Sequence, residues 1–204
     1  PIHAGFVGND ALYITDEAHL STAFIETVEA ACRYGADVRL IAMTATPVVE
    51  KTAVVRLSSA DQAHPTLLRR LQTSKIAQLV ICDSGEPDFV KKAILAAEQL
   101  SESARVIGVV VNRVATARNI QQALIKRKHR AELLTGRVRA YDRDRLMERL
   151  LPEIRAGRIR TDGEPLFIVA TQTVEVGADI DFDALLTEAA PLDSLLQRFG
   201  RLDR

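Results

Sequence analysis

Short apolar runs alternate along this chain with longer stretches in which apolar residues recur every three or four positions. The short runs predict buried strands, whereas the longer stretches predict helices with one apolar face. The expected strands are residues 11–14, 39–43, 53–57, 79–82, 106–112, 131–135, 166–171 and 184–187. The expected helices are residues 20–34, 64–75, 88–101, 118–128 and 142–155. This alternation indicates the α/β class, with parallel sheets joined by right-handed crossovers.

A turn at Pro47 separates the first two strands from the others. Residues 1–50 are therefore expected to be the carboxyl-terminal part of a first domain, and residues 51–204 are expected to form a second domain. The chain starts without an initiator methionine and stops inside a polar motif, so both ends are expected to be cuts in a longer polypeptide.

The composition is typical of a soluble globular protein, with 204 residues of which 47% are hydrophobic and 26% charged. No apolar run approaches the roughly 20 residues that would span a bilayer, so no membrane partner is expected. Cys32 and Cys82 are isolated within apolar stretches. This predicts buried free thiols and a reducing, cytoplasmic location.

The formal net charge is zero, but the charges are unevenly distributed. Residues 126–160 hold 12 Lys and Arg against 5 Asp and Glu, a local excess of seven that the rest of the chain compensates. Such asymmetry is typical of a protein with one surface that faces phosphates. A solvated helix with many ion pairs would give the same pattern, because acids interleave with the arginines.

Four polar motifs follow expected strands or close the chain. They are Asp16-Glu17-Ala18-His19, Thr44-Ala45-Thr46-Pro47, the segment 171–179 and the segment 197–204. Two adjacent acids at a strand end suit metal-assisted phosphoryl transfer, with Asp16 holding Mg²⁺ directly or through water and Glu17 orienting the attacking water. Taken alone, the acids fit a solvated strand end equally well.

The other motifs carry compatible chemistry. The hydroxyls of Thr44 and Thr46 can relay hydrogen bonds from the acids to a facing domain. Arg201 and Arg204 share one helical face, where they could stabilise charge on a transferred γ-phosphoryl group, and Gln197 fits the same surface. Thr171 follows a strand and could give its hydroxyl and N–H to a nucleic-acid phosphate.

In this order the four motifs resemble the later motifs of a superfamily-two helicase: a DEAH box with the Walker B acids, a coupling motif, a second-domain motif and an arginine-finger motif. The segments 16–27 and 187–193 resemble the helicase of type I CRISPR-Cas systems, most closely subtype G, formerly called U. The resemblance implies tandem RecA-like domains of the P-loop NTPase class, with the first one truncated. It also implies ATP and Mg²⁺ as cofactors, and single-stranded DNA and an RNA-guided CRISPR surveillance complex as partners.

The resemblance assigns further roles. His19 would couple the nucleotide site to the second domain, although a structural histidine is the alternative. Gly177, Asp179 and Gly200 would lie at the nucleotide. Asn112 and Arg113 would lie near the bound strand. Arg137 and Arg139, which follow an expected strand within the basic segment, are expected to contact phosphates.

Two sequence features expected of a complete enzyme are missing from the 204 residues. No Gly-x-x-x-x-Gly-Lys-Ser/Thr phosphate loop and no His-Asp doublet occur. We therefore expect the phosphate loop upstream, the nuclease domain outside this chain, and no turnover by the chain alone. The expected function is that of an ATP-dependent DNA helicase in antiviral defence. A helicase subunit of another defence or restriction system, or a DNA-binding module without turnover, remain alternatives.

Overall fold

The computed structural model describes residues 8–44, 57–72, 75–82, 85–136, 138–159, 163–175 and 179–202. The chain divides into two compact units, Pro1–His64 and Pro65–Arg204. Each unit is described by itself. The expected boundary at residue 50 lies outside the described residues.

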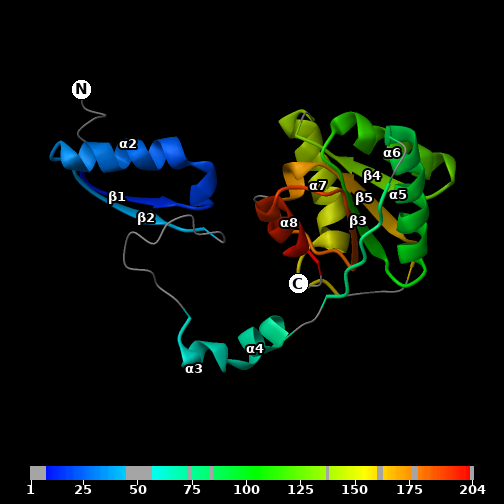
Figure 1. Ribbon diagram of the computed structural model, residues 1–204, viewed down its shortest axis with the longest axis horizontal. Helices are drawn as coiled ribbons and strands as arrows, with labels where there is room; N and C mark the ends of the chain where they lie inside the picture. The colour runs from blue at the N-terminus through cyan, green and yellow to red at the C-terminus, as the bar shows by residue number, and fades with distance from the viewer. Residues whose placement is uncertain are drawn as a thin grey trace. The chain divides into compact units, whose positions relative to one another are not determined.

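Unit 1 is a two-stranded parallel sheet with a helix on one face (Figure 1). Strand β1 (Asn9–Thr15) pairs with β2 (Asp37–Ala42), and the connection runs through a 3-10 turn η1 (Ala18–Leu20) and helix α2 (Thr22–Arg33). Tyr13 of β1 meets Phe24 of α2 edge to face at 5.6 Å. A short helix α3 (Ser59–Gln62) follows, and Ser58 and Asp61 cap its start reciprocally.

The opposite face of this sheet is open in the described residues. Leu12, Ile14, Ile41 and Met43 are 45–60% exposed, because alternate side chains of a strand point away from the face that α2 covers. The prediction that β1 is fully buried is therefore wrong for this face. Cys32 is free, as predicted, but exposed, because α2 lies on the surface of unit 1.

Unit 2 has a four-stranded parallel sheet in the order β4-β5-β3-β6. Its strands are β3 (Val106–Val110), β4 (Arg130–Leu134), β5 (Leu166–Ala170) and β6 (Ala184–Thr187). Its helices are α4 (Pro65–Gln72), α5 (Gly85–Ser101), α6 (Val114–Lys126), α7 (Ala140–Ile154) and α8 (Leu192–Phe199). None of the helices in the described ranges is long and apolar enough to cross a membrane.

The sheet of unit 2 lies between two helical layers (Figure 1). Phe167 and Val169 of β5 pack with α5 and α6, whereas Ile168 and Ala170 of the same strand pack on the side of α7. The central strands β3 and β5 are buried along their whole length, as expected for a parallel sheet covered on both faces.

Four of the expected strands of unit 2 are confirmed, but one is not. Residues 79–82 form no strand, and residues 53–56 lie outside the described part of the chain. Leu79 is 85% exposed and Ile81 is 70% exposed. This segment has the apolar composition of a strand, but no other strand pairs with it in the described part of the chain. Cys82, in the same segment, is free and half-buried.

Candidate functional site

The acids of unit 1 lie beside the Thr44 motif. Backbone pairing continues beyond both strands: Met43 N–H donates to the Thr15 carbonyl and Ala18 N–H donates to the Met43 carbonyl, each at 2.9 Å. These bonds hold the loop that carries Asp16 and Glu17 against the segment that leads to Thr44. The structure therefore brings these predicted residues together. The side chain of His19 and all of Thr46 lie outside what it describes.

Glu17 has a backbone conformation that is uncommon for a residue other than glycine. Its φ of 47° and ψ of 51° lie in the left-handed region. Its N–H donates to Asp16 Oδ1 at 2.9 Å, so the Asp16 carboxylate stabilises the turn that presents Glu17. Such conformations cost about 1–3 kcal/mol and cluster at functional sites, which supports Glu17 as a functional residue.

The acid turn suits a magnesium ion that is carried by a nucleotide. A carboxylate has two oxygens, so Asp16 can hold the turn through Oδ1 and offer Oδ2 to the ion. Protein sites for Mg²⁺ commonly supply one or two carboxylates, and substrate phosphates and water supply the other ligands. Within the described ranges no group of three or more His, Cys, Asp or Glu could hold a metal ion by itself.

Unit 2 has a groove of about 550 Å³ at the carboxyl ends of its strands. It is lined by Asn112 and Arg113 after β3, Gly136 after β4 and the residues 171–173 after β5. Parallel strands end at the same edge of a sheet, which is where such folds bind ligands. Three predicted nucleic-acid contacts, Asn112, Arg113 and Thr171, thus meet at one groove.

The groove offers several hydrogen-bond donors to an anion. Helix α6 begins there, and no side chain caps its first turn, so the backbone N–H groups of its first residues are available to a ligand. Arg113 is exposed and adds a positive charge. The Thr171 hydroxyl lies 3.3 Å from Thr173 Oγ1, which itself donates to the Leu134 carbonyl at 3.2 Å. Such a long bond is easily exchanged for one to a phosphate.

The side chain of Asn112 is engaged within the protein. Its Nδ2 donates to the Ala189 carbonyl at 2.8 Å, and its Oδ1 accepts from Arg198 Nη2 at 2.9 Å. Its backbone N–H donates to Glu188 Oε2 at 2.7 Å. Asn112 therefore shapes the wall of the groove in this structure, and its direct contact with a nucleic acid stays a prediction.

Arg198 is an important residue that the sequence reasoning missed. It is 1% exposed, and its Nε donates to Glu175 Oε1 at 2.8 Å. Its Nη1 donates to Thr187 Oγ1 at 2.9 Å and to the Glu188 carbonyl at 3.1 Å. One guanidinium thus joins α8 to the ends of three strands. The apolar pattern gave no signal for this burial, because the apolar positions of α8 include Leu192, Leu196 and Phe199, which are 40–69% exposed, and Arg198 lies off their face.

Arg201 also donates to the segment after β5. Its Nε reaches the Val174 carbonyl at 3.1 Å and its Nη2 reaches the Glu175 carbonyl at 2.8 Å. Gln197 is half-buried on α8, and Gly200 ends that helix. Arg204 and Gly177 lie outside the described residues. A catalytic role for Arg201 stays a prediction, and it would require Arg201 to exchange these two carbonyls for a phosphate.

Asp179 lies next to a buried ion cluster. It is exposed, and its carbonyl accepts a hydrogen bond from Ala156 N–H at 3.3 Å. Arg158, whose side chain is 5% exposed, pairs with Asp181 at 2.9 Å and with Asp183 at 2.5 Å. Two of the three acids in this stretch therefore stabilise unit 2, and the nucleotide contact of Asp179 stays a prediction.

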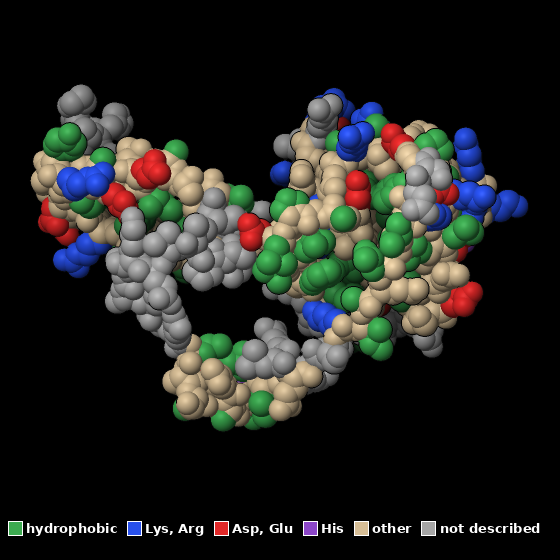
Figure 2. Space-filling view, viewed as in Figure 1, with side chains coloured by type: hydrophobic (Ala, Val, Ile, Leu, Met, Phe, Trp, Pro, Cys, Tyr) green, Lys and Arg blue, Asp and Glu red, His purple; other side chains and the backbone are tan. Residues whose placement is uncertain are grey.

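Much of the basic segment is paired with acids. The pairs are Arg127–Glu98, Arg130–Glu153, Arg139–Asp142, Arg143–Asp144, Arg149–Glu132 and Arg158–Asp181. In the view of Figure 2, most Lys and Arg side chains of unit 2 lie along its upper and right margins, with acids near some of them. Ion pairs thus involve six of the twelve basic residues of this segment, and the phosphate-facing interpretation stays a prediction.

Two members of this segment show how different the pairs are. Hydrogen bonds from Arg130 lower the pKa of Glu153, so this pair is well formed. Arg139, by contrast, has a side chain that is 85% exposed, and its bond to Asp142 at 2.7 Å contributes little stability. Arg139 can therefore exchange this partner for a phosphate. Arg137 lies outside the described residues.

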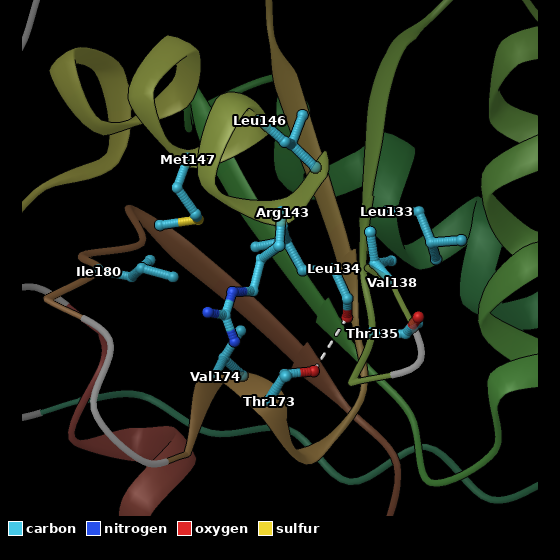
Figure 3. Close-up of a pocket in the computed structure, with 10 residues that line it drawn as sticks. All are labelled: Leu133, Leu134, Thr135, Val138, Arg143, Leu146, Met147, Thr173, Val174 and Ile180. Atoms are coloured by element: carbon cyan, nitrogen blue, oxygen red, sulfur yellow. Dashed lines mark hydrogen bonds between the residues drawn. The ribbon is translucent and has the colours of Figure 1, made fainter. Parts of the chain in front are cut away.

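A second hollow, of about 420 Å³, lies between β4, α7 and the segment after β5 (Figure 3). Its walls are mostly apolar, with Leu146, Met147 and Ile180 among them. Arg143 extends its guanidinium toward Thr173 and Val174. Thr173 lines this hollow and the groove alike. Thr173 therefore borders both hollows, whereas its neighbour Val174 is 1% exposed and packs in the core.

A family model described as "CRISPR-associated nuclease/helicase Cas3, C-terminal" matches residues 89–204. The chain is 27% identical over 232 residues to the CRISPR-associated nuclease/helicase Cas3 of Streptococcus thermophilus, covering 99% of this chain and 24% of that protein. It is 32% identical over 115 residues to the CRISPR-associated helicase Cas3 of Thermoproteus tenax, covering 56% of this chain and 19% of that protein. The chain thus spans no more than a quarter of the length of these relatives.

Solved structures show the same fold. The crystal structure of T. fusca Cas3-AMPPNP matches with a TM-score of 0.66 at 18% identity, covering 94% of this chain and 26% of that one. The structure of T. fusca Cas3-ATP matches with a TM-score of 0.64 at 18% identity, covering 94% of this chain and 27% of that one. The α/β, RecA-like prediction is confirmed by these matches and by the parallel sheets of both units. The subtype stays a prediction.

Proposed function

Because the chain belongs to the family of the CRISPR-associated nuclease/helicase Cas3, C-terminal part, we propose that it carries the core of an ATP-dependent DNA helicase. In this proposal the complete protein couples ATP hydrolysis to movement on single-stranded DNA, and unit 2 binds the DNA strand. The single observation that carries the proposal is the groove of unit 2, where Arg113, Thr171 and the start of α6 meet.

The groove fits a backbone phosphate better than a base. Its donors are backbone N–H groups, threonine hydroxyls, the Gln172 amide and one guanidinium, and groups of these kinds commonly bind phosphate oxygens without reading sequence. A motor that moves along any DNA sequence needs contacts of this kind. The first turn of α6 contributes a partial positive charge at the same place.

Unit 1 would supply the nucleotide chemistry. Glu17 is proposed to orient the attacking water, and Asp16 to hold Mg²⁺ beside the phosphates. Thr44 would pass the state of the nucleotide to unit 2, where Arg201 would reach the γ-phosphate on closure. The T. fusca Cas3 structures that share the fold are those of Cas3-ATP and Cas3-AMPPNP, which supports ATP as the nucleotide.

The partners follow from the family. The relative from Streptococcus thermophilus is named a nuclease/helicase, so we propose that a nuclease domain acts together with this helicase core. We further propose recruitment by an RNA-guided surveillance complex, after which the motor would draw in the opened DNA strand for degradation.

The groove can be tested on the chain itself. Binding of a labelled oligo-dT strand would be measured by fluorescence anisotropy over a range of salt concentrations. Arg113→Ala should weaken binding and lower the slope of log K against log salt by about 0.7, the value for one phosphate contact on a single strand. Arg118→Ala is the matched control, because Arg118 is exposed on α6 but does not line the groove. Equal effects of the two variants would remove the groove from the proposal.

A further inference from the structure

Tyr141 is an exposed aromatic residue in the first turn of α7. It is 69% exposed, although aromatic side chains carry a large apolar surface and usually bury it. The guanidinium carbon of Arg145, one turn further along the helix, lies over the Tyr141 ring at 5.7 Å from its centroid. This cation–π contact holds the ring at the surface, so most of Tyr141 stays accessible to a ligand.

The start of α7 lies at the same edge of the sheet as the groove. Gly136, in the loop between β4 and α7, lines the groove. Gly136 and Tyr141 are five residues apart, so the chain spans at most about 18 Å between them. Arg143 extends its guanidinium toward Thr173, which also lines the groove (Figure 3). A strand that leaves the groove past Gly136 would therefore reach Tyr141 within a few nucleotides.

Arginines flank the exposed ring. The side chain of Arg139 is 85% exposed and that of Arg143 is 54% exposed. Each pairs with an acid of the same helix, at 2.7 and 3.2 Å, and exposed pairs of this kind contribute little stability. Cations beside an accessible aromatic ring are the combination that binds single-stranded nucleic acids, because the cations follow the backbone and the ring stacks on a base.

The charges around Tyr141 favour a nucleic acid over a protein as the partner. Of the residues 139–145, five are charged, and they alternate in sign along the start of α7. The core of a protein–protein interface is depleted of charged residues, whereas the surface here has an aromatic ring enclosed by them. The groove at the same edge adds donors that suit phosphates.

We propose that Tyr141, held by Arg145, is a stacking platform for one base of the single strand that leaves the groove. The proposal rests on the function proposed above and adds a contact to a base, where the groove supplies contacts to phosphates. Every base has a π-face, so the platform does not select a sequence. The bases of a duplex are already stacked on one another, so the platform favours a single strand.

The test compares two strands of equal length, oligo-dT and a fully abasic strand, which carry the same number of phosphates. The Kd of the chain for each would be measured by fluorescence anisotropy, and the ratio of the two Kd values reports the stacking. Tyr141→Leu should lower this ratio by about 5- to 150-fold, the value for one base stacked on an aromatic ring. Tyr141→Phe should keep the ratio of the wild type, because it keeps the ring. Because Tyr141 is exposed, both variants should melt within about 1 °C of the wild type.

Tyr34→Leu is the matched control. Tyr34 is 93% exposed at the end of α2 in unit 1, and its replacement should leave the ratio within twofold of the wild type. Arg145→Gln should lower the ratio by about two- to fivefold, because an exposed cation–π contact is lost. Arg113→Ala should weaken the binding of both strands alike, because the groove contacts phosphates.

Tyrosine emission gives a second measurement, because the chain has three tyrosines and no tryptophan. Bound oligo-dT should quench this emission in the wild type and in Tyr34→Leu, but not in Tyr141→Leu. If neither strand binds to the wild-type chain, the platform and the proposed function fail together. If Arg113→Ala weakens binding but Tyr141→Leu keeps the ratio and the quenching, the platform alone fails. A surface that serves a protein partner would give this second result.

Discussion

Replacing Gly108 with alanine tests the packing that supports the segment 197–204, which carries Arg198 and Arg201. A Cβ at this position would lie 2.7–2.9 Å from three atoms of the Phe182 ring. The ring would have to retreat by about 0.7 Å to regain an ordinary contact of 3.4 Å. Phe182 is fully buried, and its N–H donates to the Arg201 carbonyl at 2.8 Å, so the retreat would also push on the segment that contains Arg201.

The expected cost follows from this overlap. Forcing one methyl group into a packed core typically costs about 1–3 kcal/mol. For a unit of this size that corresponds to a loss of about 4–12 °C in melting temperature. Circular dichroism of the wild-type and Gly108→Ala chains would measure the loss. Phe182→Leu should restore part of it in the double variant, because the smaller side chain leaves room for the new methyl group.

Gly136→Ala provides the matched control. A Cβ at Gly136 would meet only Thr173 Cγ2 at 3.8 Å, which is an ordinary contact, so the melting temperature should stay within about 1 °C. Because Gly136 lines the groove, the control may be checked for oligo-dT binding in the same samples. A Gly108→Ala chain with the same melting temperature as the wild type would refute the packing argument.

Three further predictions concern the acids, a lysine and the response to pH. In the complete protein, Glu17→Gln should reduce hydrolysis by a factor of about 10²–10⁴ and leave the Kd for ATP nearly unchanged, which stopped-flow binding and steady-state kinetics would separate. Lys75 donates to the carbonyls of Phe199 and Leu202 at the end of α8, so Lys75→Met should lower the melting temperature by a few degrees and Lys75→Arg should retain it. Hydrogen bonds from Arg130 depress the pKa of Glu153, so this pair stabilises the fold above the unfolded pKa near 4.5, and the stability is lost as the pH falls through the lower folded value. Glu153→Gln should therefore flatten the dependence of the melting temperature on pH below about 5. An unchanged slope in this pH range would contradict the stabilising role of the Arg130–Glu153 pair.

The apolar pattern of the sequence was sufficient to predict the strands that pair with other strands in a sheet. Strands β3 and β5 are buried on both faces, so nearly every residue is apolar and the signal is strong. The segment 79–82 has the same composition but forms no strand. Its side chains are largely exposed, because strand formation also requires a free edge at the right place, and residue type does not encode that.

The site was predictable wherever it depends on strand ends. Asp16 and Thr44 follow neighbouring parallel strands, and Arg113 and Thr171 follow two others, so topology alone brings each pair to one edge. The partners of each side chain were not predictable. Asn112 was expected at the nucleic acid, but its amide is held by Arg198 and by a carbonyl 77 residues away.

The arginines of the segment 197–204 show why sequence spacing alone does not assign a role to a residue. Arg198, Arg201 and Arg204 are each three residues apart, so the argument that places two of them on one helical face applies equally to the third. Arg198 and Arg201 differ in the partners that the structure describes for them. Arg198 is bound to the carboxylate of Glu175, whereas Arg201 donates to two neutral carbonyls.

This difference decides which arginine can move. If Arg201 turned toward a phosphate, it would exchange two bonds to neutral carbonyls for bonds to a charged acceptor, which an arginine can bind in a bidentate way. If Arg198 did the same, Glu175 would be left buried without its partner, at a cost of about 3–5 kcal/mol. Of these two arginines, Arg201 is therefore the better candidate for a finger, a role that stays a prediction, whereas Arg198 holds α8 to Glu175.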